Sequence, residues 1–373
     1  MKICYLSNSA IPSTVASSIQ IVKMCEAFSE LKNNVLLITT NVKKKNDNIF
    51  KYYDVKNKFI IKRIKSFTQF PLGIKYYLFS IFSILESLKF KPDIYITRNF
   101  FTCFLLILLR KKTIIELHHD LNTESRIVKF LAKYFKFLNS KYLQKAIAIT
   151  NGIGNEFINK RYIKEKKILV LPSGSSLKYI KSLSNIKNYF KIGYFGSLYK
   201  SRGLELIKKL AKIDRNNEYY LFGDLKNINY LKYKNLIKNL HFQNHVPYKD
   251  IPKNLSKMDI LILPYVSAIT VAGDVGDITK YTSPLKLFDY LSAGKIILCS
   301  DYKVLKEVID ENNAIFVKNY KNIYSWKNEI NKLSNQPQKQ FIISKNNYNL
   351  SKRFTLKERA KKILKEVSKN KCI

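Results

Sequence analysis

One stretch of this sequence, residues 277–295, gathers residue types from which a nucleotide-binding site is built. We expect Ser283 and Pro284 to begin a helix there, because a proline loses nothing by lacking an N–H at the first helical position. The free N–H groups of that first turn, which includes Leu285, can hold a phosphate. Asp289 follows about one and a half turns later, where its carboxylate can chelate the two hydroxyls of a ribose. An ordinary helix with an exposed aspartate is the alternative interpretation.

Short apolar strands alternate with helices along the first half of the chain. The strands are expected at residues 2–6, 35–39, 58–64, 93–97, 113–117, 146–150 and 167–171, and the helices at residues 18–31, 74–88, 100–109 and 125–141. Such alternation is typical of βαβ units, so it predicts a parallel sheet covered by helices.

The second half repeats the pattern after a polar junction at residues 173–188. Strands are expected at residues 191–195, 218–222, 241–244, 259–263, 296–299 and 314–317, and helices at residues 203–213, 231–240, 248–257, 286–292, 304–309, 324–334 and 355–369. The chain therefore predicts two α/β domains, 1–175 and 188–350, followed by a C-terminal segment, 351–373. Ligands of such sheets bind at the carboxyl ends of the strands, so a cleft between the two sheets is the expected site.

The order of residues after Asp289 carries a family resemblance. Ala293 and Gly294 end the helix, a strand follows, and Ser300 and Asp301 come next. This pattern resembles the signature of retaining glycosyltransferases of the glycogen-synthase-like superfamily, the glycosyl transferases group 1. The resemblance implies a GT-B fold, in which two Rossmann-like parallel-sheet domains face a central cleft. It also implies that residues 1–175 bind the acceptor and that residues 188–350 bind the nucleotide sugar, with Asp289 holding the ribose. The C-terminal helix, in residues 351–373, is expected to pack back on the first domain.

One position departs from the family pattern. The family places two acidic residues eight apart, and Tyr281 stands where the first of them, a glutamate, is expected. The run of residues 281–288 is similar to that of a known subset of the superfamily. We therefore interpret Tyr281 as a donor-site residue of a subtype.

A second loop, at Gly196 and Ser197, resembles the family's first loop of the C-terminal domain, where a basic pair holds the donor diphosphate. Arg202 matches one member of the pair, while Ser197 stands where the other, usually arginine, is expected. Lys200 and Lys286 are the candidate substitutes. A leaving nucleoside diphosphate gains negative charge, and fixed cations stabilise it. A solvated surface charge is the alternative for Arg202.

Candidate residues in the first half follow the same resemblance. His118, directly after the strand at residues 113–117, stands where the family often has a histidine that reaches toward the donor sugar. Ser17 and Ser18 lie in the first loop, which the resemblance assigns to the acceptor and the donor phosphates. Arg98 ends another strand and is a further acceptor-site candidate. The alternative for His118 and its neighbour His119 is an ordinary surface pair.

The activity that the resemblance implies is transfer of a hexosyl or N-acetylhexosaminyl group, with retained anomeric configuration. The expected donor is a nucleoside-diphosphate sugar, with UDP favoured, and the acceptor is a hydroxyl of a surface glycan, such as lipopolysaccharide or capsule, or of a lipid-linked saccharide. His118, Arg202 and Lys286 form the predicted catalytic set, without metal or further cofactor. A nucleotide-sugar epimerase of the same fold and a basic nucleic-acid-binding protein are the alternatives.

The strongly positive net charge is the feature that favours a nucleic-acid-binding protein. The chain carries 67 Lys and Arg against 27 Asp and Glu, a net charge of +40. No motif of a nucleic-acid-binding fold accompanies it, and lysine and asparagine are abundant throughout, which indicates a compositional bias. Lysines interleave with aromatics at residues 126–143, which predicts contact with an anionic membrane surface. The alternative is that these aromatics belong to the core.

The remaining signals concern compartment and metals. The apolar run after Met1 is too short for a signal peptide, and the five cysteines are scattered, so we expect a cytoplasmic protein, peripheral on the inner face of the membrane. The longest apolar run, residues 100–109, is too short to span a bilayer. His241 and His245 lack partners at the spacing of a zinc site, so no metal is expected.

Overall fold

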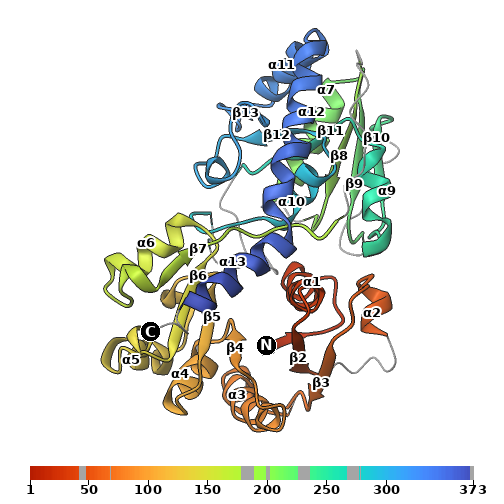
Figure 1. The fold of residues 1–373 in the computed structure, drawn as a ribbon. Coiled ribbons are helices and arrows are strands. Elements are labelled where there is room, and N and C mark those ends of the chain that lie inside the picture. Colours follow the sequence, from red (N-terminus) through yellow and green to blue (C-terminus); the bar gives the residue numbers. More distant parts are fainter. Residues whose placement is uncertain are drawn as a thin grey trace. The chain divides into compact units, whose positions relative to one another are not determined.

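The fold is known from a computed structural model that describes residues 1–41, 48–67, 69–177, 189–198, 202–225, 236–266, 277 and 279–369 (Figure 1). The chain divides into two compact units. Unit 1 comprises Met1–Pro172 and Leu356–Ile373, and unit 2 comprises Ser173–Thr355. Unit 2 is thus continuous in sequence, whereas unit 1 is completed by the last segment of the chain.

Unit 1 is built on a seven-stranded parallel sheet with the order β3-β2-β1-β4-β5-β6-β7. Its strands are β1 (Lys2–Ala10), β2 (Asn34–Thr40), β3 (Ile60–Ile64), β4 (Ile94–Thr97), β5 (Thr113–Leu117), β6 (Leu143–Ala148) and β7 (Ile168–Val170). The strand order reverses between β1 and β4, which makes that pair the topological switch point of the sheet.

Helices cover both faces of this sheet. They are α1 (Ala16–Glu30), α2 (Ile49–Tyr52), α3 (Leu72–Leu88), α4 (Phe100–Leu108), α5 (Arg126–Tyr134), α6 (Asn151–Asn159) and α13 (Leu356–Lys369). Side chains alternate across a strand, so Ile3 and Tyr5 pack with α1 and α13, while Cys4 and Leu6 pack on the opposite face with α3 and α4. The C-terminal helix is therefore part of the core of unit 1.

Unit 2 repeats this three-layer plan with a six-stranded parallel sheet in the order β10-β9-β8-β11-β12-β13. Its strands are β8 (Lys191–Phe195), β9 (Glu218–Phe222), β10 (Leu240–Gln243), β11 (Ile260–Leu263), β12 (Ile296–Ser300) and β13 (Ala314–Val317). Its helices are α7 (Leu204–Ile213), α9 (Ile251–Ser256), α10 (Leu285–Ser292), α11 (Ile323–Ser334) and α12 (Pro337–Ser351). The predicted architecture of two parallel sheets flanked by helices is confirmed.

Two predicted helices were wrong. The helix expected at residues 125–141 ends at Tyr134, because Lys136 adopts a left-handed conformation with φ of 45° that an α-helix excludes. A short 3₁₀ turn, Phe137–Asn139, follows it. The helix expected at residues 304–309 is a single 3₁₀ turn, Leu305–Glu307. Of the helix expected at residues 231–240, residues 231–235 lie outside the described residues, and Leu240 already begins β10.

Three helices, α2, α6 and α12, were not predicted. Polar residues make up much of the buried face of α12, so its sequence lacks an apolar stripe. Ser344 Oγ donates to the carbonyl of Gly294, and Asn347 Nδ2 donates to the carbonyl of Lys295 at 2.8 Å. The helix is therefore fixed by hydrogen bonds to the turn between α10 and β12.

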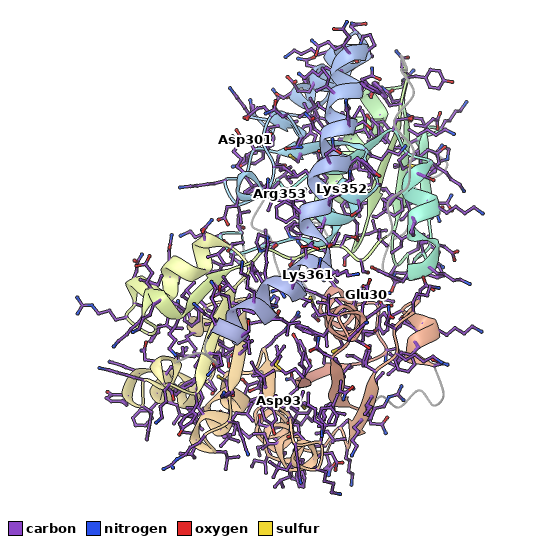
Figure 2. All side chains as sticks on the ribbon, in the orientation of Figure 1. Glu30, Asp93, Asp301, Lys352, Arg353 and Lys361 are labelled. Carbon is purple, nitrogen blue, oxygen red and sulfur yellow. The ribbon has the colours of Figure 1, made fainter. Side chains whose placement is uncertain are left out.

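The lysines and arginines are distributed over both units. Figure 2 shows charged side chains projecting around the outside of each unit, and Glu30, labelled there, accepts a hydrogen bond from Lys357 at 2.6 Å. Such exposed pairs contribute little to stability. Within the described residues, no helix is both long and apolar enough to cross a membrane.

Packing of α13 into unit 1 predicts a specific loss of stability. Ile363, on the buried face of α13, is 1% exposed, so Ile363→Ala should lower the free energy of unfolding by about 2–5 kcal/mol. Leu108→Ala is the matched control, because Leu108 is 66% exposed and its truncation should cost less than about 0.5 kcal/mol. Chemical unfolding measures both values. Equal losses in the two variants would show that α13 is not part of the core.

Candidate active site

The switch point of unit 2 lies between β8 and β11, whose carboxyl ends lead into Gly196 and Pro264. Gly203, which precedes α7, has a φ of +80°, and a Cβ at this position would lie 1.9 Å from the carbonyl oxygen of Pro264. Only glycine fits this close approach. The turn that carries Arg202 is therefore held directly against the end of β11.

Two cations and two tyrosines meet at this switch point. Lys286 Nζ donates to Tyr194 Oη at 2.7 Å, and the Arg202 guanidinium lies 6.0 Å from the centre of the Tyr265 ring. Burial and the neighbouring guanidinium of Arg202 lower the pKa of Lys286 well below its usual value. Two like charges held close together favour binding of an anion such as a diphosphate.

The loop after β8 borders this pair of cations. A Cβ at Gly196 would lie 2.9 Å from Lys286 Nζ, so the absence of a side chain leaves room for the ammonium group. Ser197 is exposed, and its carbonyl oxygen accepts a hydrogen bond from Tyr194 Oη at 2.9 Å. The structure thus brings together the predicted residues Gly196, Ser197, Arg202 and Lys286. Lys200 lies outside the described residues.

The start of α10 lies next to Lys286 in the chain. Pro284 is the N-cap and Leu285 the first helical residue, one position later than expected. Ser283 Oγ accepts a hydrogen bond from the N–H of Ser173 at 3.0 Å. Tyr281 is half-buried in the turn before the helix. The first-turn N–H groups of α10 are therefore placed beside the cation that the helix carries.

Asp289 lies one turn beyond Lys286 on α10. Its Oδ1 accepts a hydrogen bond from Ser175 Oγ at 2.6 Å. Burial raises the pKa of Asp289 to about 7, although the Ser175 hydrogen bond acts in the opposite direction. The carboxylate is half-buried and accepts readily when ionised, as chelation of ribose hydroxyls requires. Ser175 was not predicted, because nothing in its local sequence points to a residue 114 positions away.

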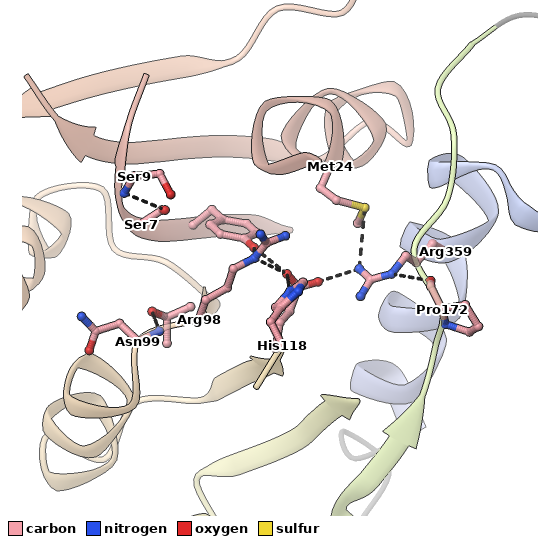
Figure 3. A network of polar contacts seen from close by, with 11 residues as sticks. Ser7, Ser9, Met24, Arg98, Asn99, His118, Pro172 and Arg359 are labelled. Carbon is pink, nitrogen blue, oxygen red and sulfur yellow. Dashed lines mark hydrogen bonds and ion pairs between the residues drawn. The ribbon is translucent and has the colours of Figure 1, made fainter. Parts of the chain in front are cut away.

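In unit 1, a buried carboxylate in β5 holds together Tyr5 of β1, Arg98 after the end of β4 and Arg359 of α13 (Figure 3). Glu116 of β5 is 1% exposed. Its Oε2 accepts from Tyr5 Oη at 2.6 Å and from Arg98 Nε at 2.9 Å, and its Oε1 accepts from Arg359 Nη1 at 2.6 Å. Burial alone would raise the pKa of Glu116, but the guanidiniums of Arg359 and Arg98 outweigh it and hold the pKa well below its usual range.

His118 lies just beyond β5 beside this carboxylate. Its side chain is 21% exposed, and its Nε2 is 3.6 Å from Glu116 Oε2. Burial, together with the positive charge of Arg98, lowers the pKa of His118 to about 4, against the opposing pull of Glu116. His118 is therefore a neutral imidazole at physiological pH. His119 instead pairs with Glu124 at 2.8 Å.

The acceptor-site candidates Arg98, Ser17 and Ser18 lie in two different parts of unit 1. Arg98 belongs to the Glu116 cluster, where its Nε also donates to Tyr5 Oη at 3.0 Å. Ser18 is buried at the start of α1, where its hydroxyl donates to the carbonyl of Ala10 at 3.1 Å and accepts from Ser13 Oγ at 2.9 Å. Ser17 is half-buried in the same turn. The structure brings Arg98 and His118 together but holds the serines in a separate local network.

Glu116, Tyr5 and Arg359 were not predicted as members of a site, although two of them leave a signal. Glu116 interrupts an otherwise buried apolar strand, and a buried charge requires partners. Arg359 falls on the buried face of α13 between Leu356 and Ile363, where an apolar residue is expected. Tyr5 leaves no such signal, because tyrosine is common in strands.

No metal centre is formed by the residues that the structure describes, since they contain no group of three or more histidine, cysteine, aspartate and glutamate side chains. His241 pairs with Glu218 alone.

Comparison with known proteins identifies the class. Residues 175–350, nearly the whole of unit 2, match the family model described as Glycosyl transferases group 1. Among curated proteins, none matches the sequence. Unit 2 is therefore a glycosyl transferases group 1 domain, and glycosyl transfer is the activity that this match supports.

Solved structures extend the fold assignment to the whole chain. Anabaena HepE, solved with UDP and glucose, is 15% identical, with a TM-score of 0.70 over 99% of each chain. Sucrose-phosphate synthase from Thermosynechococcus elongatus is 13% identical, with a TM-score of 0.74 over 100% of this chain and 99% of the other. WaaG, a glycosyltransferase involved in lipopolysaccharide biosynthesis, is 14% identical, with a TM-score of 0.63 over 97% and 99%. The fold is GT-B.

The raised pKa of Asp289 predicts a pH-dependent difference in stability. An unfolded carboxyl loses its proton near 3.8, whereas the folded group keeps its proton up to about 7, so the wild type loses stability as pH rises between these values. Asp289→Asn lacks this loss and should gain up to about 4 kcal/mol relative to wild type between pH 4 and pH 8. Unfolding of unit 2 measured across this range tests it. Glu311→Gln, at an exposed carboxylate, is the control, and a pH-independent difference for both variants would contradict the assignment.

Proposed function

We propose that this glycosyltransferase moves a sugar, with retained anomeric configuration, from a UDP-sugar to a hydroxyl of a surface glycan or lipid-linked saccharide. The observation that carries the proposal is the pairing of Arg202 and Lys286 beside Asp289, within the family-matched residues 175–350. HepE, which shares the fold, was solved with UDP and glucose, which supports a uridine nucleotide as donor.

The cations have a direct role in this proposal. When the bond between the anomeric carbon and the diphosphate oxygen breaks, negative charge develops on the leaving UDP. Arg202 and Lys286 are positioned to stabilise that charge without a metal. Burial has already removed water from Lys286, so its interaction with the diphosphate is stronger than that of a solvated lysine.

Asp289 and His118 complete the assignment. The ionised carboxylate of Asp289 accepts hydrogen bonds from both ribose hydroxyls, with Ser175 fixing its orientation. His118 contacts the transferred sugar, as its position directly after β5 and the family resemblance imply. Ser17 and Ser18 stay candidates for the acceptor or the donor phosphates.

A membrane-bound acceptor accounts for the surface of α5. Only Val128 and Ala132 of this helix are buried, whereas Phe130, Tyr134 and Phe135 are more than half exposed, which argues against a core role for these three aromatics. Lysines at positions 129, 133 and 136 flank these aromatics in the sequence. Exposed aromatics flanked by lysines suit insertion into the headgroup region of anionic lipid. We infer that this helix holds the enzyme at the membrane surface where its acceptor resides.

Nucleotide binding tests the donor site. UDP and UDP-glucose should raise the melting temperature of the wild type, since a ligand stabilises the state that binds it. Arg202→Ala and Asp289→Ala should each weaken UDP binding about tenfold or more, because each removes a contact to the nucleotide. Arg215→Ala, at an exposed arginine of the same unit, is the matched control. Binding of UDP that is unaffected in both site variants would remove these residues from the donor site. Conversion of UDP-glucose without an acceptor would instead indicate an epimerase.

Flotation with vesicles tests the membrane surface. The wild type should float with phosphatidylglycerol vesicles at low salt and less with rising salt, because charge screening weakens the attraction. The double variant Phe130→Ser, Tyr134→Ser should lose most of this binding. Tyr324→Ser is the control, since Tyr324 is 61% exposed in unit 2, a similar exposure to the 63% of Tyr134. Equal flotation of the double variant and the wild type would rule out α5 as the contact.

A further inference from the structure

We propose that Arg359 and Glu116 are positioning residues for His118. The C-terminal helix, through the buried carboxylate, fixes the orientation and tautomer of the imidazole, so that His118 presents Nδ1 as a hydrogen-bond acceptor to a hydroxyl of the transferred sugar. This inference rests on the proposed function, which places His118 at that sugar.

The carboxylate is immobilised before any substrate binds. Tyr5 and Arg98 occupy one oxygen of Glu116 and Arg359 occupies the other, so rotation of the carboxylate would break three hydrogen bonds. Such charge-assisted bonds are among the stronger ones in proteins. Glu116 therefore offers His118 a fixed negative group on one side.

The side chain of Arg359 is held in place by contacts of its own, so it can fix the position of Glu116. Its Nε donates to the carbonyl of Pro172 at 3.1 Å, its Nη1 contacts the Met24 sulfur at 3.7 Å, and it is 4% exposed. In Figure 3, Arg98 and Arg359 enter the cluster on opposite sides of His118. Two guanidiniums thus face one carboxylate around the imidazole.

This arrangement decides which nitrogen of His118 carries the proton. An ionised carboxylate only accepts hydrogen bonds, and the nitrogen that faces it is Nε2, at 3.6 Å from Glu116 Oε2. That distance is too long for a hydrogen bond, but the attraction still favours a proton on Nε2. Nε2 is buried, so the exposed part of the ring lies elsewhere, and a neutral ring protonated on Nε2 keeps its lone pair on Nδ1.

Burial and the surplus of positive charge together keep the ring of His118 neutral. The titratable and charged groups around His118 are Tyr5 of β1, Cys25 of α1, Arg98 after β4, Glu116 of β5 and Arg359 of α13. Burial raises the pKa values of Tyr5 and Cys25 well above their usual range, so both stay uncharged. One negative and two positive charges remain, and an imidazolium would add a third positive charge. His118 therefore cannot act as an acid at neutral pH but can accept a hydrogen bond.

The tautomer is directly observable in the unmodified full-length enzyme. With ¹³C,¹⁵N-labelled histidine, the ring shifts of His118, assigned through His118→Asn, should be those of a neutral Nε2–H tautomer from pH 8 to about pH 5. An Nδ1–H tautomer, or titration of His118 near 6.5, would overturn the proposal. This measurement needs neither turnover nor a donor, so its failure is distinct from failure of the proposed function, which the UDP-binding experiment decides.

Variants test the role of the last helix. In Arg359→Gln one of the two cations is lost, so the pKa of His118 should rise above its wild-type value. The kcat for sugar transfer should fall about 10- to 100-fold, while the KM for the donor changes less than about threefold. Arg359→Lys keeps the charge and should restore the low titration point. Lys361→Gln is the matched control, because it removes an exposed positive charge from the same helix.

The outcomes separate positioning from general damage. Loss of activity in Arg359→Gln without a change in His118 titration would assign Arg359 a structural role only and overturn the proposal. If Arg359→Gln does not fold, Glu116→Gln is the second variant. It leaves His118 neutral but replaces an obligate acceptor with a group that also donates, so the ring should show a mixture of tautomers. A single Nε2–H tautomer in Glu116→Gln would contradict the role of Glu116.

Discussion

The ionised carboxylate of Glu116 is buried in the central sheet of unit 1, and it must be paired with hydrogen-bond donors and positive charges from other elements of the unit. An isolated ionised group of this kind costs several kcal/mol to bury, and its partners must come from elsewhere in the chain. Glu116 draws them from β1, from the end of β4 and from the last helix. The apolar face of α13 supplies the packing energy, and Arg359 gives the helix a fixed register against the sheet.

Charged residues gather at equivalent places in the two sheets, but the charge of the cluster differs: unit 1 surrounds a carboxylate with cations, whereas unit 2 places two cations side by side. In both, the charged residues gather where the strand order reverses. In unit 1 the carboxylate of Glu116 is paired within the unit with the two guanidiniums of Arg98 and Arg359. Unit 2 holds Lys286 and Arg202 close together and places Asp289 one helical turn away, bonded to a serine. A buried cation beside another cation is unfavourable until an anion joins them, and in the proposed function that anion is the diphosphate of the donor.

Much of the fold could be predicted from the sequence because strands and helices obey local periodicity. The strand at residues 113–117 and the helix at residues 74–88 show this, with ends within two residues of the structure. The predictions of helices were wrong where the conformation of a single residue or the burial of polar side chains departs from the apolar periodicity of the sequence. Lys136 breaks a continuous amphipathic run through its backbone conformation, and α12 buries amides and hydroxyls instead of an apolar stripe. The donor-site candidates lie in short sequence motifs, which made their proximity to one another predictable, while their role stays a prediction. The bonds Ser175–Asp289 and Glu116–Arg359 join residues 114 and 243 positions apart, and single residues carry no mark of such partners.

The division of unit 1 into two segments sets an order for assembly during synthesis. Unit 2 is one continuous stretch, so it can fold as soon as it leaves the ribosome, as domains generally do. The sheet of unit 1 is made first but waits for α13 to cover it, and until then Glu116 lacks Arg359. The nascent chain therefore carries an incomplete first unit, a natural substrate for chaperones, while its second unit matures. The Glu116 cluster forms only after α13 has been synthesised, so full order around His118 depends on residues that lie on both sides of unit 2 in the sequence.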